Sequence, residues 1–314
     1  MDTLDLATIN RHLDIDAVRR DCERNFDEYS KGNSVVPPVG YLAFPDGECH
    51  IKYGYIKGDP CFVVKIAGGF YKNVDKGLKP STGMMLICST ETGYPLAVLN
   101  DEGHLTDMRT AIAGSIAAKF LAPAGIRRIG IVGAGIQARL QLECLRSITD
   151  CRRVLIWNRT AANAEALVQS LSGSNLDAHV AEDLESLVRA CNLIVTTTPA
   201  REPLIRADWV QAGTHITAVG ADAPGKQELD EALMEKADIC VVDSASQCID
   251  HGETHTAVAN GLIDAAKLVE LGDVIGGRAP GRETPEQISV ADLTGVAVQD
   301  IAIATSVYER WRQA

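Results

Sequence analysis

The feature that most constrains this chain is an apolar run that ends in closely spaced small residues, Ile129-Gly130-Ile131-Val132-Gly133-Ala134-Gly135-Ile136-Gln137-Ala138. Its order predicts a buried strand, a tight turn and a helix: Gly133 permits the turn, Gly135 lets a pyrophosphate approach the backbone, and Ala138 allows close helix packing. Free N–H groups at the start of such a helix attract anions. A dinucleotide site is therefore expected, rather than a purely structural glycine turn. The residues expected to form it are Gly133, Ala134, Gly135, Ile136 and Gln137.

Short β-branched runs alternate with helical stretches from about residue 127 onward. Each strand candidate is almost continuously apolar, as expected for a parallel strand covered on both faces. The pattern predicts an α/β fold with a doubly wound parallel sheet of the Rossmann type. The expected strands are 128–132, 154–157, 193–197, 215–219 and 239–242, and the expected helices are 136–147, 161–170, 184–190 and 229–236.

The chain before residue 127 has a different pattern, with strands separated by Gly and Pro. An opening helix over 14–30 is expected, followed by an antiparallel sheet. Thr106 is predicted to cap a bridging helix that ends at residue 121, before Pro123. The expected strands include 50–56, 61–66, 84–88 and 96–99. A last helical stretch, 296–311, has the pattern either to complete the Rossmann sheet or to return to the first domain.

Composition excludes several classes of partner. The 314 residues carry a formal net charge of −12, which disfavours nucleic acid and anionic lipid surfaces. The acidic amino terminus and the lack of an apolar span of ~20 residues predict a cytoplasmic protein that does not enter a membrane. Nine cysteines without a Cys-x-x-Cys pair indicate neither a disulfide framework nor a zinc ribbon.

The second predicted Rossmann strand ends in Trp157-Asn158-Arg159-Thr160. NAD-selective sites commonly place Asp or Glu here for the ribose 2′-hydroxyl, whereas a neutral residue beside an Arg can accept a 2′-phosphate. Asn158, Arg159 and Thr160 therefore favour NADP(H). NAD(H) stays open, because Arg159 can also be a solvated residue at a helix start.

Three basic residues in the first half are candidates for binding a carboxylate. Lys52 and Lys65 stand inside apolar strand runs, and Arg109 stands near the start of the bridging helix. Hydride chemistry on an amino acid needs a cationic grip on the carboxylate and an acid/base group near the nitrogen. For Lys65 alone, a place on the solvent face of its strand fits the pattern equally well.

Several separate runs share one resemblance. They are Lys65-Ile66-Ala67-Gly68-Gly69-Phe70-Tyr71-Lys72-Asn73, Thr92-Gly93-Tyr94-Pro95-Leu96-Ala97, Leu105-Thr106-Asp107-Met108-Arg109-Thr110-Ala111 and Gly220-Ala221-Asp222-Ala223-Pro224-Gly225-Lys226-Gln227-Glu228-Leu229. Together with the glycine turn they resemble the ornithine cyclodeaminase/mu-crystallin family, which includes archaeal-type alanine dehydrogenases and ketimine reductases. The resemblance extends from about residue 35 to the carboxyl end.

The resemblance implies a homodimer whose amino-terminal sheets meet, with the last helix returning to that domain. The expected domains are 1–122, for substrate binding and dimerisation, joined by 296–314, and 123–295, for the dinucleotide. The family's catalytic lysine falls on Lys65, its carboxylate-binding arginine on Arg109 and its acid/base aspartate on Asp222. Asp222 also follows a predicted strand at the sheet's carboxyl edge, where such folds bind ligands. Its alternative is a turn residue before Pro224.

The same comparison assigns further coenzyme contacts. Thr82 and Thr110 are expected near the phosphate and nicotinamide, Thr198 on the adenosine side, and Val219 and Thr294 beside the nicotinamide. One departure concerns the substrate: many members have an arginine after a Val-Pro-Pro-like segment, whereas this chain has Gly40. We hypothesise that Lys52 supplies the missing charge.

A metal site is not expected. Cys248, His251 and His255 lie close together in sequence. The stretch 249–256 has no helical apolar face, so it is predicted to be a loop rather than a metal-ligating helix.

Three functions follow in order of preference. The first is an NAD(P)H-dependent oxidoreductase of a small α-imino or α-amino acid, either a ketimine reductase or an amino-acid dehydrogenase. The second is ornithine cyclodeaminase-type chemistry, in which NAD+ oxidises the amine, ammonia leaves and the hydride returns. The third is a protein that binds NADP(H) and a small ligand, of the mu-crystallin type.

Overall fold

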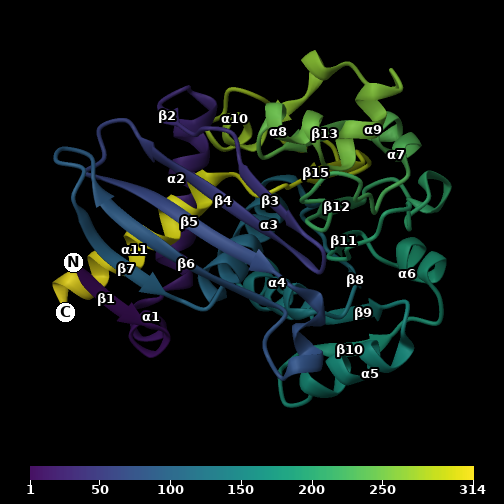
Figure 1. The fold of residues 1–314 in the computed structure, drawn as a ribbon. Helices are drawn as coiled ribbons and strands as arrows, with labels where there is room; N and C mark the ends of the chain where they lie inside the picture. Colours follow the sequence, from purple (N-terminus) through teal and green to yellow (C-terminus); the bar gives the residue numbers. More distant parts are fainter. The chain divides into compact units, whose positions relative to one another are not determined.

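The computed structural model describes the backbone of residues 1–314 and the side chains of residues 1–70 and 72–314. The chain divides into two compact units, 1–112 together with 296–314, and 113–295. Each unit has its own sheet (Figure 1). The two units are described separately below.

The second unit contains an eight-stranded sheet in the order β10-β9-β8-β11-β12-β15-β13-β14, and every neighbouring pair is parallel. The doubly wound α/β fold predicted from the sequence is confirmed. The strand order reverses between β8 and β11, and open α/β sheets bind ligands at the carboxyl edge of such a reversal. The strands are β8 (Ile129–Val132), β9 (Arg153–Trp157), β10 (Asp177–Val180), β11 (Leu193–Thr196), β12 (His215–Ala218), β13 (Ile239–Val242), β14 (Val269–Glu270) and β15 (Ser289–Asp292).

Helices connect these strands. The expected helices are present, although two of them are shorter than predicted. They are α4 (Ile136–Leu145), α5 (Ala161–Ser170), α6 (Leu184–Ala190), α7 (Glu231–Lys236), α8 (Ala245–Asp250), α9 (Glu253–Ala259) and α10 (Leu271–Ile275), with 3-10 turns at Ala207–Trp209 and Ala265–Lys267.

Strand β15 is central in the sheet, between β12 and β13, yet the sequence did not reveal it. Its two ends, Ser289 and Asp292, are polar and interrupt the apolar pattern. Both are buried and bonded: the Ser289 hydroxyl donates to Leu121 O at 3.0 Å, and Asp292 accepts from the Thr254 amide at 2.9 Å. The ends of this strand are therefore stabilised by tertiary hydrogen bonds, and the apolar pattern that would have predicted it is missing.

The 249–256 segment was predicted to be a loop, and this prediction is wrong. Helices α8 and α9 occupy most of it, separated by His251 and Gly252. Ser244 caps α8, and the first turn of α9 is anchored when Thr254 donates to Asp292 through both its amide and its hydroxyl. Polar anchors, rather than an apolar face, stabilise these short helices.

The first unit is built on a seven-stranded mixed sheet in the order β1-β7-β6-β5-β4-β2, with β3 also paired to β4. Strand β1 runs parallel to β7, and the other pairs are antiparallel, as expected for this half. The strands are β1 (Asp2–Asp5), β2 (Ser34–Val35), β3 (Gly40–Phe44), β4 (Gly47–Ile56), β5 (Cys61–Gly69), β6 (Ser81–Ser89) and β7 (Pro95–Asn100), with a 3-10 helix at Tyr71–Lys76.

One face of this sheet is covered by helices from both ends of the chain. Helix α11 (Ala297–Gln313) lies across β4, β5 and β6 and packs against α2 (Ile15–Ser30), with α1 (Leu6–His12) beside it (Figure 1). Alternate residues Cys61, Val63 and Lys65 of β5 point to this covered face and are buried. The carboxyl-terminal helix therefore belongs to the first unit.

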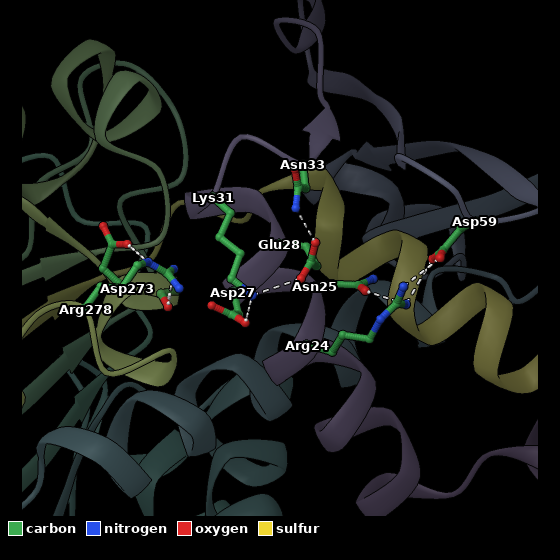
Figure 2. Close-up of polar contacts among 10 residues, drawn as sticks. Arg24, Asn25, Asp27, Glu28, Lys31, Asn33, Asp59, Asp273 and Arg278 are labelled. Atoms are coloured by element: carbon green, nitrogen blue, oxygen red, sulfur yellow. Dashed lines mark hydrogen bonds and ion pairs between the residues drawn. The ribbon is translucent and has the colours of Figure 1, made fainter.

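Helix α2 is fixed at several points (Figure 2). Arg24 forms a two-pronged ion pair with Asp59, in the turn between β4 and β5, at 2.6 and 3.0 Å. Neighbouring Asn25 donates to Val298 O at 3.2 Å, one residue before Gln299. Helix α2 therefore links the start of α11 to the turn between β4 and β5.

Helix α3 (His104–Leu121) begins two residues before Thr106, so the prediction that Thr106 is its N-cap is wrong. Asp101, three residues before the helix begins, binds an amide of the first turn instead, because its Oδ2 accepts from the Leu105 amide at 2.7 Å. Its carboxyl is buried, and burial raises its pKa. No helix among the described residues combines the length and the hydropathy needed to cross a lipid bilayer.

Candidate active site

The covered face of the first sheet carries two buried lysines side by side. Lys65 in β5 pairs directly with Lys52 in β4 and with Met85 in β6. Directly opposed residues of neighbouring strands point to the same face, so both ammonium groups lie beneath α11. The alternative position for Lys65, on the solvent face of its strand, is excluded because its side chain is 1% exposed.

Arg109 from α3 meets the same cluster through the carboxylate of Asp300 in α11. Asp300 Oδ1 lies 3.1 Å from Lys65 Nζ and 3.0 Å from Arg109 Nε. Gln299 accepts from Arg109 Nη1 at 2.8 Å. The structure thus brings together three residues predicted from the sequence, Lys52, Lys65 and Arg109, and adds Asp300 and Gln299 to them.

Burial and neighbouring charge act on Lys65. Desolvation and the positive charge of Arg109 lower its pKa from 10.5 to about 7, while the opposite charge of Asp300 acts against this shift. Lys65 is therefore divided between amine and ammonium near neutral pH. An anion entering the cluster would favour the ammonium form, because opposite charges stabilise each other in a low dielectric.

Asp300 was not predicted from the sequence, although a signal for it exists. Val296-Ala297-Val298-Gln299-Asp300-Ile301-Ala302-Ile303-Ala304 is an apolar run broken only by an amide and an acid. Asp300 is 1% exposed. A buried acid in such a run needs a partner, so this pattern could have indicated a buried cation near Asp300.

Gly40, which stands where many family members carry an arginine, pairs with Ile51 across β3 and β4. A Cβ on Gly40 would lie 3.2 Å from Ile51 Cβ, so a side chain at position 40 would share the face of Ile51. Lys52 is the next residue of β4 and points to the opposite face, so this placement gives no support to the hypothesis that Lys52 supplies the missing charge.

In the second unit the glycine turn joins β8 to α4 as predicted. Gly133 has φ of +114°, a conformation that side chains rarely permit. A Cβ at Gly135 would meet no atom within 4 Å, so the turn presents open space at the helix start. Ile136 there is 56% exposed. These features fit a dinucleotide phosphate at the N–H groups of the first turn of α4.

The end of β9 has no acid at the position that would bind a ribose 2′-hydroxyl. Asn158 donates to Thr160 O at 3.0 Å, and both Arg159 and Thr160 are exposed. An exposed guanidinium at this strand end is compatible with a 2′-phosphate.

Two further strands place predicted residues at the same carboxyl edge. Thr198 follows β11, and Val219 and Asp222 follow β12. Asp222 forms an ion pair with Lys226 at 2.6 Å, and its side chain remains 48% exposed. The carboxylate is thus oriented by Lys226 without being enclosed.

Thr294 follows β15, and its hydroxyl is already used by the protein. It donates to Asp243 at 3.0 Å and accepts from Gln247 at 2.9 Å, with the side chain buried. These hydrogen bonds fix the segment that follows β15. In the first unit, Thr82 is exposed in β6, and Thr110 donates to Thr106 O within α3.

Buried carboxylates also lie behind the edge of the second sheet. Burial raises the pKa of Glu228 and of Asp292 to about 7, and that of Glu253 well above its usual value. None of these three carboxylates was predicted from the sequence to have a role. Cys248 is likewise buried, with a raised pKa. Among the residues that the structure describes, no group of His, Cys, Asp and Glu side chains is arranged to hold a metal ion.

The sheet order and the glycine turn define the class of Rossmann-type dinucleotide-binding folds. Residues 2–314 match the model of the ornithine cyclodeaminase/mu-crystallin family, and the chain belongs to that family. The chain is 44% identical over 305 residues to an uncharacterized cyclodeaminase of Sinorhizobium fredii, covering 95% of this chain and 91% of the relative.

Two solved structures with bound coenzyme are similar over the full length of the chain. One is an archaeal alanine dehydrogenase dimer with bound NAD, at 36% identity and a TM-score of 0.93, covering 100% of this chain and 96% of that one. The other is the iminosuccinate reductase of Paracoccus denitrificans with NAD+, at 30% identity and a TM-score of 0.92, covering 100% and 97%.

The lowered pKa of Lys65 gives a prediction for stability. Between pH 7 and 10.5 the unfolded chain binds a proton that the folded Lys65 does not, so the free energy of unfolding should rise with pH in this window. From pH 7.5 to 9, the wild type should gain up to about 2 kcal/mol relative to Lys65→Met, at about 1.4 kcal/mol per pH unit. Urea denaturation at each pH, at one protein concentration, measures the difference.

The matched control is Lys72→Met, which changes a lysine that is 70% exposed and should follow the wild-type slope. Parallel wild-type and Lys65→Met curves across the window would contradict the lowered pKa.

Proposed function

We propose that the chain is an NAD(P)H-dependent oxidoreductase acting on the C–N bond of a small α-imino or α-amino acid, as a ketimine reductase or an amino-acid dehydrogenase. The observation that carries the proposal is the buried cluster of Lys65 and Arg109 around Asp300. In its ammonium form Lys65, together with Arg109, outnumbers the Asp300 carboxylate that contacts both, so the cluster then has an excess of positive charge. A substrate carboxylate would balance it.

The substrate carboxylate is held by Arg109 together with one or both lysines. The fork of N–H groups on Arg109 suits a planar carboxylate, and Gln299 limits its rotation. Lys65 becomes charged as the carboxylate arrives, which strengthens the grip. The reacting α-carbon, next to the carboxylate, is thereby fixed in position.

Asp222 is the proposed proton donor to the imine nitrogen, or proton acceptor in the reverse direction. Its exposed fraction leaves it accessible, and Lys226 orients it. When bound at the glycine turn, a nicotinamide coenzyme supplies the hydride for the α-carbon. Gly133, Ala134, Gly135, Ile136 and Gln137 would hold its phosphates, with Thr82, Thr110, Thr198, Val219 and Thr294 as further candidate contacts.

The activity is tested by following NADPH and NADH absorbance with pyrroline-2-carboxylate, piperideine-2-carboxylate, and pyruvate or oxaloacetate plus ammonia. Turnover is expected with at least one of them. Asp222→Asn should lower kcat by about 100-fold or more, because proton transfer by a positioned acid contributes 100- to 10,000-fold.

Asp208→Asn, in an exposed ion pair of the same unit, is the control and should leave kcat unchanged. Ammonia release from ornithine with NAD+, without net change in absorbance, would point instead to the cyclodeaminase reaction. Coenzyme binding without turnover of any substrate would favour a binding protein.

For the coenzyme we propose a preference for NADP(H), with NAD(H) also accepted. The support is the exposed Arg159 at the end of β9, where an acid is absent. Arg159→Ala should lower kcat/KM for NADPH by about 10-fold, as expected when a charge-assisted contact is lost, and change the value for NADH by less than about 3-fold.

Arg153→Ala, at the opposite end of the same strand, should alter neither value. A wild-type enzyme that prefers NADH, with Arg159→Ala unchanged, would overturn the proposed preference.

We also propose a homodimer formed through the outer face of the first sheet. Tyr53, Ile66 and Met84 are large apolar residues on the face opposite Lys65, and each is 39–44% exposed. Exposed apolar surface of this kind marks protein interfaces. One of the similar solved structures is a dimer.

Met84→Glu should convert the dimer to monomer at micromolar concentration, measured by sedimentation velocity, because an unpaired charge would be buried at the interface. Val180→Glu, on an exposed apolar residue of the other unit, should leave the dimer intact. A monomeric wild type, or a Met84→Glu dimer of unchanged affinity, would contradict the proposed interface.

A further inference from the structure

Glu228, which lies just before α7, has a fully buried carboxylate that accepts four hydrogen bonds. Its Oε1 accepts from the Thr198 amide at 2.6 Å and from the Thr198 hydroxyl at 2.7 Å. Its Oε2 accepts from the Thr196 hydroxyl at 2.7 Å and from the Gly220 amide at 2.9 Å. The two amides can only donate, and with both hydroxyls donating as well the arrangement suits the ionised carboxylate.

These bonds join the ends of two neighbouring strands. Thr198 follows β11, and Gly220 follows β12 and stands two residues before Asp222. A Cβ on Gly220 would collide with Thr198 O and with the Glu228 carboxylate, so the close approach of the two strand ends depends on a glycine. The carboxylate therefore sets the distance between these two segments.

The four hydrogen bonds to Glu228, called the Glu228 clamp below, also affect the glycine turn. A Cβ on Gly133 would collide with the Thr197 hydroxyl and would lie 3.3 Å from Thr198 Cγ2. Thr197 also donates both its amide and its hydroxyl to Val132 O, at 2.9 and 3.1 Å. Whatever fixes residues 197–198 thus also supports the turn that begins at Gly133.

A buried carboxylate is a costly way to join two loops, because burying a charge is unfavourable and apolar packing serves stability as well or better. Its advantage is directional: two oxygens with four donors fix positions more narrowly than apolar contacts do. We propose that Glu228 is a positioning residue of the coenzyme site, which holds the glycine turn, the Thr198 segment and the Asp222 loop in register. The inference rests on the proposed coenzyme binding at the glycine turn.

The first test compares Glu228→Gln with Glu253→Gln. Glu253 is also a fully buried glutamate of this unit, but it accepts from the backbone amides of Glu228 and Leu229, both at 2.8 Å, and not from the coenzyme-side segments. An amide at 228 would present N–H groups to donors, which breaks part of the clamp. Fluorescence titration of NADPH and NADH gives the dissociation constant, and thermal unfolding gives Tm.

Glu228→Gln should weaken coenzyme binding by about 10-fold and also lower kcat, because the Asp222 loop shifts. Glu253→Gln should keep the dissociation constant within about 2-fold at a similar loss of Tm. Equal weakening by both variants would mean that any loss of packing has this effect, and would overturn the proposal.

A second pair covers the case in which Glu228→Gln fails to fold. Thr196→Val removes one donor to Glu228 and keeps the shape of the side chain. Thr217→Val makes the same change at a fully buried position on neighbouring β12, where the hydroxyl contacts His215 Nε2 at 2.9 Å. We expect Thr196→Val to weaken coenzyme binding by about 3-fold or more and Thr217→Val to leave it unchanged.

The outcomes separate this inference from the proposed function. A wild type that binds neither coenzyme would overturn both. A wild type that binds a coenzyme, with Glu228→Gln and Thr196→Val binding it equally well, would overturn only the positioning role of Glu228.

Discussion

The first unit depends on one buried carboxylate placed between two buried cations. Without Asp300, Lys65 and Arg109 would stand in a low-dielectric interior with no opposite charge, and such a state is strongly unfavourable. This requirement explains why α11 lies on the first sheet and why α2 fixes its start through Asn25. In the proposed function, the positive charge that Asp300 leaves unbalanced would bind the substrate carboxylate.

Charge is buried in two different ways. In the first unit, the cations Lys65 and Arg109 contact the carboxylate of Asp300. The second buries Glu228, Glu253 and Asp292, whose described hydrogen bonds come from backbone amides and hydroxyls. In the proposed function the cations of the first unit bind a substrate carboxylate. The buried carboxylates of the second unit instead fix loops at the strand ends. These are different uses of the same unfavourable desolvation.

The predictability of each part follows from how local its determinants are. The glycine turn and five of the eight strands of the second unit were predicted from the sequence, because strands covered on both faces are continuously apolar. Strands β10 and β14, at the two edges of the sheet, lack this pattern and were missed. Strand β15 was missed because its ends are polar residues held by tertiary hydrogen bonds. The start of α3 was misplaced because Asp101, rather than Thr106, accepts a hydrogen bond from an amide of the first turn. Lys65 and Arg109 were identified from the family resemblance. Their partner Asp300 is distant in sequence, and no local pattern specifies which cation it meets.

The first unit is discontinuous in the sequence, and this affects the order in which its parts are synthesised. Residues 1–112 are separated from the helix that completes their core, α11, by the whole of the second unit, so α11 is translated only after that unit. The Rossmann-type unit, 113–295, is contiguous and can fold as soon as it has emerged. Until α11 has been translated, the lysine-bearing face of the amino-terminal sheet lacks the helix that lies across β4, β5 and β6. A chain cut before residue 296 would lack both this helix and Asp300, so Lys65 and Arg109 would lose their carboxylate partner.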